Sequence, residues 1–131
     1  MRAPAAMAIE AGDTRAAVPL LIDGVTGQLR TFERLAPVIR SWLLDNARTL
    51  SLSLRPPPPP PITCAQLGKI RVPVAIARGE LARPFYRIGA EMAHRSIPGS
   101  RLMVIPGGGH LAPAIHTAAF NEALLRFLTT L

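Results

Sequence analysis

The sequence predicts an α/β fold whose second half alternates strand, helix, strand and helix behind a helical first half. A β-branched run at residues 72–77, closed by Gly79, predicts a first strand, and Arg101–Ile105 predicts a second. The helical pattern between them is long enough for the crossover that a parallel pair requires. Because a parallel pair is normally buried on both faces within a larger sheet, this unit needs strands that the 131 residues do not supply.

Proline and glycine delimit the helices of the second half. Pro84 suits the first turn of a helix that ends before Ile97-Pro98-Gly99. A last helix is predicted over residues 114–128, after the break at Pro106 and the three glycines that follow it. Helical spacing assigns buried faces to both helices. They are Phe85, Ile88 and Met92, with Ala93 as a further candidate, in the first helix, and Phe120, Ala123, Leu124 and Phe127 in the last.

Residues 1–55 read as a helical, cap-like segment. The pattern over residues 5–22 breaks at Gly12-Asp13, where Asp13 can cap a following helix that Pro19 is expected to perturb or end. A second amphipathic pattern predicts a helix that has Pro37 in its first turn and runs to about Leu52. Its apolar residues, at near-helical spacing, are Leu35, Ile39, Trp42, Leu43 and Leu50.

Six prolines, residues 56–61, separate this segment from residues 62–131. Each ring fixes φ and removes a backbone donor, so the run must be extended. It could serve as a ligand for an aromatic-lined groove, but we favour a stiff linker between the two parts of the chain.

Composition excludes several classes of protein. With 49% apolar and 18% charged residues the chain can bury a core. The single cysteine, Cys64, cannot form an internal disulfide. The sequence shows no signal-peptide pattern and no apolar stretch of membrane-spanning length. We therefore expect a soluble cytoplasmic protein that is not in a membrane. The net charge is +7, but the arginines are scattered singly with one Tyr and one Trp for base stacking, which argues against nucleic-acid binding.

His110 is the main candidate for chemistry. It follows the second predicted strand after three glycines, at the carboxyl end where open α/β sheets keep their sites. Glycines permit a tight loop that leaves the imidazole unobstructed. A plain Pro-Gly turn with a solvated histidine explains the motif alone equally well.

Three segments together resemble the C-terminal part of the α/β-hydrolase family. They are the strand Ile70-Arg-Val-Pro-Val-Ala-Ile-Ala-Arg-Gly79, the turn Ile97-Pro98-Gly99-Ser-Arg-Leu, and Ile105-Pro-Gly-Gly-Gly-His110. The resemblance continues through Phe120-Asn121 and Phe127-Leu128, and residues 7–55 more loosely resemble the helical cap of the same enzymes. It implies the C-terminal portion of an α/β-hydrolase fold.

The resemblance implies a Ser-His-Asp/Glu triad with His110 as the general base, since an imidazole can take a proton from the nucleophile and return it to the leaving group. No G-x-S-x-G nucleophile elbow precedes His110, and no serine here has that context. Cys64 is expected to be a buried or inert thiol rather than a nucleophile. Ala82 stands where the family often has its acid, which leaves Glu80 as the candidate acid, although an exposed turn carboxylate explains Glu80 as well.

The function expected from this resemblance is that of a serine esterase-type hydrolase of which this chain carries the histidine half. The chain is expected to be inactive alone, as a truncated product, one piece of a split enzyme, or the product of a start codon assigned too far downstream. No metal or organic cofactor is expected, and the substrate would be a small apolar acyl or ester compound once an N-terminal half completes the site. The alternative is a non-catalytic interaction module that forms a homo-oligomer, or pairs with a complementing chain, through an exposed sheet edge.

Overall fold

A computed structural model describes residues 3–54 and 60–131. The chain divides into two compact units, Met1–Pro60 and Pro61–Leu131. Most of the predicted polyproline linker lies outside the described residues, and each unit is described here by itself.

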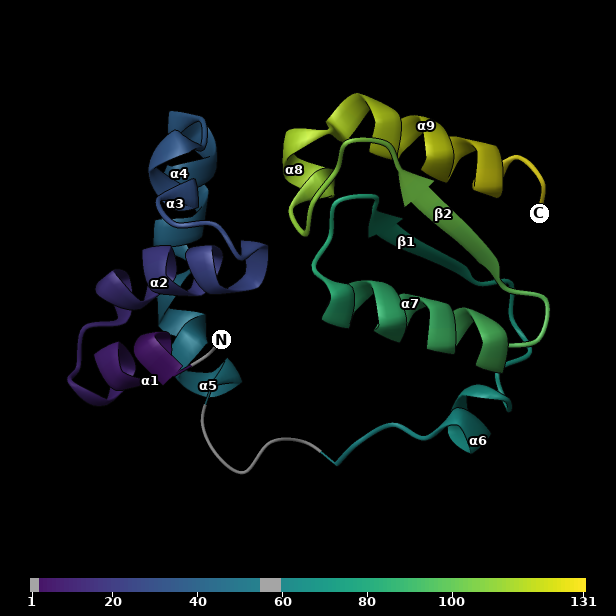
Figure 1. Cartoon of the computed structure of the whole chain (residues 1–131), viewed down its shortest axis with the longest axis horizontal. Coiled ribbons are helices and arrows are strands. Elements are labelled where there is room, and N and C mark those ends of the chain that lie inside the picture. The colour runs from purple at the N-terminus through teal and green to yellow at the C-terminus, as the bar shows by residue number, and fades with distance from the viewer. Residues whose placement is uncertain (1–2, 55–59) are drawn as a thin grey trace. The chain divides into compact units, whose positions relative to one another are not determined.

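The first unit is a set of short helices around α2 (Figure 1). Its described elements are α1 Ala3–Glu10, α2 Thr14–Thr26, α3 Thr31–Arg34, α4 Pro37–Asp45, the 3-10 turn η1 Ala47–Thr49 and α5 Leu50–Ser53. The core is small because it consists mainly of Ala5, Ala17, Val18, Ile22, Leu35 and Ala47.

Local chemistry explains where these helices begin and break. Asp13 caps α2 as predicted, because its Oδ1 accepts from the Ala16 amide at 2.8 Å. Pro19, expected to perturb or end the helix, lies inside α2 and does not end it. The helix continues because Val18 and Ile22 on either side of the proline are buried against neighbouring helices. Pro37 opens α4 as predicted.

The long helix expected to reach Leu52 is instead broken at Asn46. The side-chain amide of Asn46 donates to the Trp42 carbonyl at 2.8 Å, and its backbone leaves the helical region with φ −92° and ψ 3°. Such local side-chain bonds compete with helix continuation. Trp42, which the pattern placed on an apolar face, is 63% exposed.

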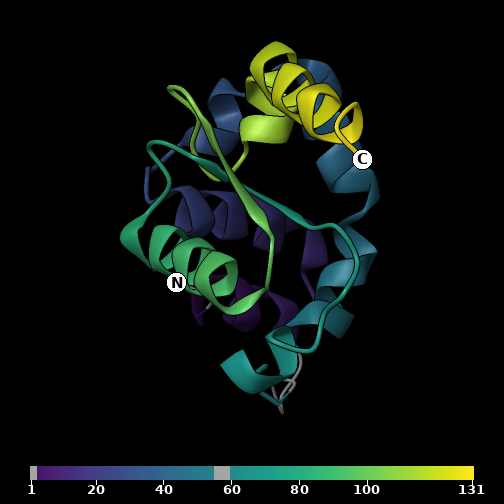
Figure 2. The ribbon, with the colours of Figure 1, turned by 90° about the vertical axis from the view of Figure 1, so that its right-hand side faces the viewer.

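The second unit contains the predicted parallel pair. Its described elements are α6 Cys64–Leu67, β1 Ala75–Gly79, α7 Pro84–Ser96, β2 Arg101–Ile105, α8 Ala112–Ile115 and α9 Thr117–Leu128. The strands pair in parallel from Ala75 opposite Arg101 to Gly79 opposite Ile105. Helices α7 and α9 lie on opposite sides of this two-stranded sheet, as both ribbon views show (Figures 1 and 2).

The boundaries of β2 and the start of α7 match the prediction, whereas β1 begins at Ala75 rather than at residue 72. Pro73 has no amide to donate to a partner strand. Pairing starts only where the Val74 carbonyl accepts from the Arg101 amide at 2.9 Å. The last helix is also shorter than predicted, because His116, with φ −110° and ψ 46°, divides it into α8 and α9.

The buried face predicted for α7 is wrong. Phe85, Ile88 and Met92 are 69%, 56% and 48% exposed. The helix instead turns small residues toward the strands, because small side chains let the helix approach the sheet closely. They include Ala90 and also Ala93, the further candidate for the predicted face. In α9 the predicted face is the less exposed one, as its members Phe120, Ala123, Leu124 and Phe127 are partly buried.

Candidate active site

The site is built on the loop that follows β2. Ile105, the last residue of the strand, is 1% exposed and anchors the loop in the core. Gly107 has a φ of +63°, which side-chain-bearing residues rarely adopt. A Cβ on Gly108 would lie 2.8 Å from the Ala112 Cβ. Gly107 and Gly108 are therefore the glycines that the chain requires to turn sharply and deliver His110 just beyond the sheet.

Three hydrogen bonds fasten this histidine loop to the turn between β1 and α7. The Glu80 amide donates to the Ile105 carbonyl at 3.0 Å, and the Leu81 amide donates to the Gly108 carbonyl at 2.8 Å. The Gly107 amide donates to the Glu80 carboxylate at 2.8 Å. The segments that follow β1 and β2 are thus hydrogen-bonded to each other at the carboxyl ends of the strands.

Gly79 makes that close approach possible. A Cβ at this position would lie 2.1 Å from the Gly108 carbonyl oxygen and 2.4 Å from that of Gly109. Gly79 was predicted only to close the first strand. In the structure the backbone of the histidine loop packs directly against it.

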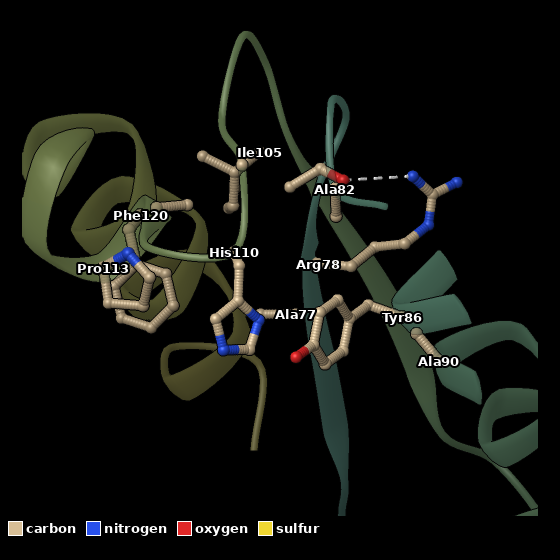
Figure 3. Close-up of a pocket in the computed structure, with 12 residues that line it drawn as sticks. Ala77, Arg78, Ala82, Tyr86, Ala90, Ile105, His110, Pro113 and Phe120 are labelled. Carbon is tan, nitrogen blue, oxygen red and sulfur yellow. Dashed lines mark hydrogen bonds between the residues drawn. The ribbon is translucent and has the colours of Figure 1, made fainter. Parts of the chain in front are cut away.

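The imidazole of His110 stacks against the phenol ring of Tyr86, with ring centroids 4.2 Å apart and planes inclined by 25° (Figure 3). Among the described residues, none hydrogen-bonds to either imidazole nitrogen. The residue is exposed at the edge of the site, yet the partial burial of its ring lowers the pKa of His110 below the ordinary 6.5. At neutral pH the imidazole is therefore mainly neutral and able to accept a proton.

His110 and Tyr86 line a pocket of about 240 Å³. The other lining residues are mostly small or apolar: Ala77, Arg78, Gly79, Ala82, Ala90, Ile105, Gly109, Ala112, Pro113 and Phe120. Arg78 is the charged member (Figure 3). Its guanidinium pairs with Glu91 at 3.2 Å, while its buried Nε has no hydrogen-bond partner within residues 3–54 and 60–131. The arrangement offers a neutral base beside a small apolar space.

The structure brings the candidate acid to the histidine loop but not to the histidine itself. The Glu80 carboxylate bonds to the Gly107 amide, and no hydrogen bond joins Glu80 and His110 among the residues described. Ala82, where the family often has its acid, is a buried wall of the pocket.

One serine does meet a histidine, a contact that the sequence did not reveal. His94 Nδ1 lies 3.0 Å from Ser100 Oγ, and Ser100 Oγ donates to the His94 carbonyl at 2.9 Å. His94 therefore contacts the Ser100 hydroxyl through both its ring and its backbone carbonyl. The pair lies before β2, at the end of the strand opposite His110, and joins α7 to the turn that follows it.

Tyr86 is the site residue that sequence reasoning missed. Its signal was its place in the first turn of a helix that starts at the carboxyl end of β1, two residues after Pro84.

Cys64, expected to be buried or inert, is exposed in the first turn of α6. In the ranges 3–54 and 60–131, no three His, Cys, Asp or Glu side chains gather into a metal-binding group, and no helix has the length and apolarity to cross a membrane.

Comparison with known proteins supplies the family relationship. No family model and no curated protein matches the sequence. Among solved structures, the crystal structure of bromoperoxidase from Bacillus anthracis superposes with a TM-score of 0.67 at 26% identity, over 89% of this chain and 44% of that one. That bromoperoxidase has the α/β-hydrolase fold.

The chain is related to the α/β-hydrolases. It spans less than half the length of the bromoperoxidase that it matches. The relationship agrees with the mixed α/β architecture and with the small parallel sheet of the second unit.

Proposed function

We propose that this chain carries the histidine half of a serine hydrolase of the esterase type, with His110 as the general base. The observation that carries the proposal is the position of His110. It follows the carboxyl end of β2, in a loop that is hydrogen-bonded to the turn after β1, and its imidazole lines an apolar pocket. In that role the imidazole takes a proton from the attacking hydroxyl and later returns it to the leaving group.

The nucleophile and the oxyanion donors of this reaction would come from residues outside these 131. No G-x-S-x-G occurs in the sequence. Ser100, which does contact a histidine, lies at the wrong end of the sheet. Since nucleophile and oxyanion hole supply much of the rate in such enzymes, we infer that the chain alone is inactive.

Glu80 is the proposed acid of the chain. Its Oε2 accepts from the Gly107 amide, so to orient His110 the carboxylate would have to accept a second hydrogen bond, from an imidazole nitrogen. The substrate would be a small apolar acyl or ester compound, because the pocket is about 240 Å³ and its lining is largely alanine, proline and aromatic carbon.

The test uses a short-chain chromogenic ester and a serine-reactive phosphonate. The purified chain alone should show neither phosphonate labelling nor His110-dependent turnover. Labelled turnover that His110→Ala abolishes would show that the chain holds its own nucleophile, and would overturn the inference of inactivity.

The second arm joins this chain genetically to the part of the bromoperoxidase that the similarity does not cover. Ester hydrolysis by the chimera, and bromide-dependent peroxidase activity as the parallel assay, should be lost in His110→Ala. The matched variants His94→Ala and His116→Ala change the other two histidines and should retain activity. A folded chimera whose activity is the same in all three variants would contradict the proposed role of His110.

A second candidate function is a non-catalytic interaction module, favoured by the exposed apolar side chains of α7 and by the two-stranded sheet, each strand of which has only one neighbour in the parts described. Such a module would form a homo-oligomer or pair with a complementing chain. Light scattering of the purified chain should then show a defined oligomer that Ile88→Asp converts to monomer. A monodisperse wild-type monomer would exclude self-association.

A further inference from the structure

The imidazole of His110 is held by an aromatic face, and no residue that the structure describes hydrogen-bonds to either of its nitrogens. We propose that Tyr86 is a positioning residue for His110, and that its ring fixes the plane of the imidazole at the pocket. The assignment rests on the proposed function only where it calls His110 a catalytic base. The contact itself belongs to the chain and can be tested without any reaction.

His110 needs such a contact because its own loop restrains it poorly. The preceding residues are glycines, which offer no side chain to pack against the ring. The nearby carboxylate of Glu80 is engaged by the Gly107 amide. Without a neighbouring surface the imidazole would rotate about two side-chain torsions at the edge of the site.

Tyr86 is well placed to provide that surface. It lies in the first turn of α7, where its amide donates to the Arg83 carbonyl at 2.9 Å. The ring of Phe85 meets it edge-on, with centroids 5.4 Å apart and planes at 73°. The turn leading into α7 is also hydrogen-bonded to the histidine loop, so the two stacked rings stand on backbone segments that are bonded to each other.

The geometry of the contact suits a base. A stacked ring touches the face of the imidazole and leaves both nitrogens in the ring plane free for a nucleophile on one side and an acid on the other. Aromatic pairs of this kind stabilise the arrangement beyond the area that they bury. The Tyr86 hydroxyl has no partner among the described residues, so the ring rather than the hydroxyl carries the role, and phenylalanine should replace it.

The experiment records proton–carbon correlation spectra of the histidine rings in the full chain. The His110 resonances are identified as those that disappear in His110→Ala. The His110 ring protons should resonate upfield, because they lie over the aromatic ring, and should show nuclear Overhauser contacts to Tyr86. Tyr86→Phe should keep the shift, whereas Tyr86→Leu, which retains apolar bulk without an aromatic face, should lose it.

Phe85→Ala is the matched control, since it removes an aromatic ring from the same turn without removing the stacked one. It should leave the His110 shift largely in place. Tyr86→Ala should also raise the pKa of His110 toward 6.5 by exposing the ring to water. If Tyr86→Leu leaves the His110 resonances unmoved, or if wild type shows no contact between the two rings, the assignment is wrong, and that outcome says nothing against the hydrolase proposal.

Discussion

A single methyl group at Gly79 should displace the histidine loop. In Gly79→Ala the new Cβ would lie 2.1 Å from the Gly108 carbonyl oxygen, whereas real Cβ contacts essentially never fall below 3.0 Å. The loop must therefore move by about 1 Å or remain strained, which costs about 1–3 kcal/mol by analogy with overpacked cores.

That movement also breaks the hydrogen bonds that fasten the loop. The bond from the Leu81 amide to Gly108 and the bond from the Glu80 amide to Ile105 contribute about 1 kcal/mol each. We therefore expect Gly79→Ala to lower the free energy of unfolding by about 3–5 kcal/mol.

Urea unfolding followed by circular dichroism measures this loss, and the His110 ring resonances report the position of the loop. Gly109→Ala is the matched control in the same loop, because a Cβ there meets nothing within 4 Å. It should change stability by less than about 0.5 kcal/mol. Equal unfolding midpoints for Gly79→Ala and Gly109→Ala would refute the packing argument.

Three further predictions concern polar groups of the second unit. Glu80→Ala removes the acceptor of the Gly107 amide, so it should lower the free energy of unfolding by about 1 kcal/mol and speed hydrogen exchange at that amide. Glu80→Gln keeps an acceptor and should leave the exchange slow. Exchange at the same rate in the wild type and both variants would show that this bond does not hold the loop. Because the folded-state pKa of His110 is lowered, the unfolded chain binds the proton more readily, so stability should be lost as the pH falls from about 6.5 through the lowered pKa. Urea titrations between about pH 5 and pH 8 should show less of this dependence in His110→Gln, and superimposable profiles would count against the burial of the ring. Glu91→Ala leaves the largely buried Arg78 guanidinium without its carboxylate and should lower the free energy of unfolding by about 1–2 kcal/mol, measured by thermal unfolding. Glu91→Gln retains a hydrogen-bond acceptor and should lower it less. An unchanged melting temperature in Glu91→Ala would contradict a stabilising role for the pair.

Prediction from the sequence succeeded where one residue type decides the backbone. Pro37 and Pro84 start helices because proline fits the first turn, and Asp13 caps α2 because its carboxylate reaches a free amide. The prediction failed at Asn46, where a side-chain hydrogen bond to a helix carbonyl competes with continuation of the helix. Hydrophobic spacing cannot reveal such competition.

The faces of α7 show a second kind of failure. The sequence carries two candidate faces, one with large apolar residues and one with small residues and Tyr86. Spacing favours the large residues, but the distance between α7 and the strands favours the small ones. Only the assembled layers decide between them.

The sequence by itself determined the parallel strand–helix–strand order and placed a histidine after three glycines at the carboxyl end of the second strand. These features follow from proline, glycine and β-branched residues acting on their own backbone. Only the tertiary structure decided that the Glu80 carboxylate holds the Gly107 amide, and that Tyr86 stacks on His110. Those contacts join residues more than twenty positions apart in the chain, and they depend on how closely the two strand ends approach, which the steric room at Gly79 sets.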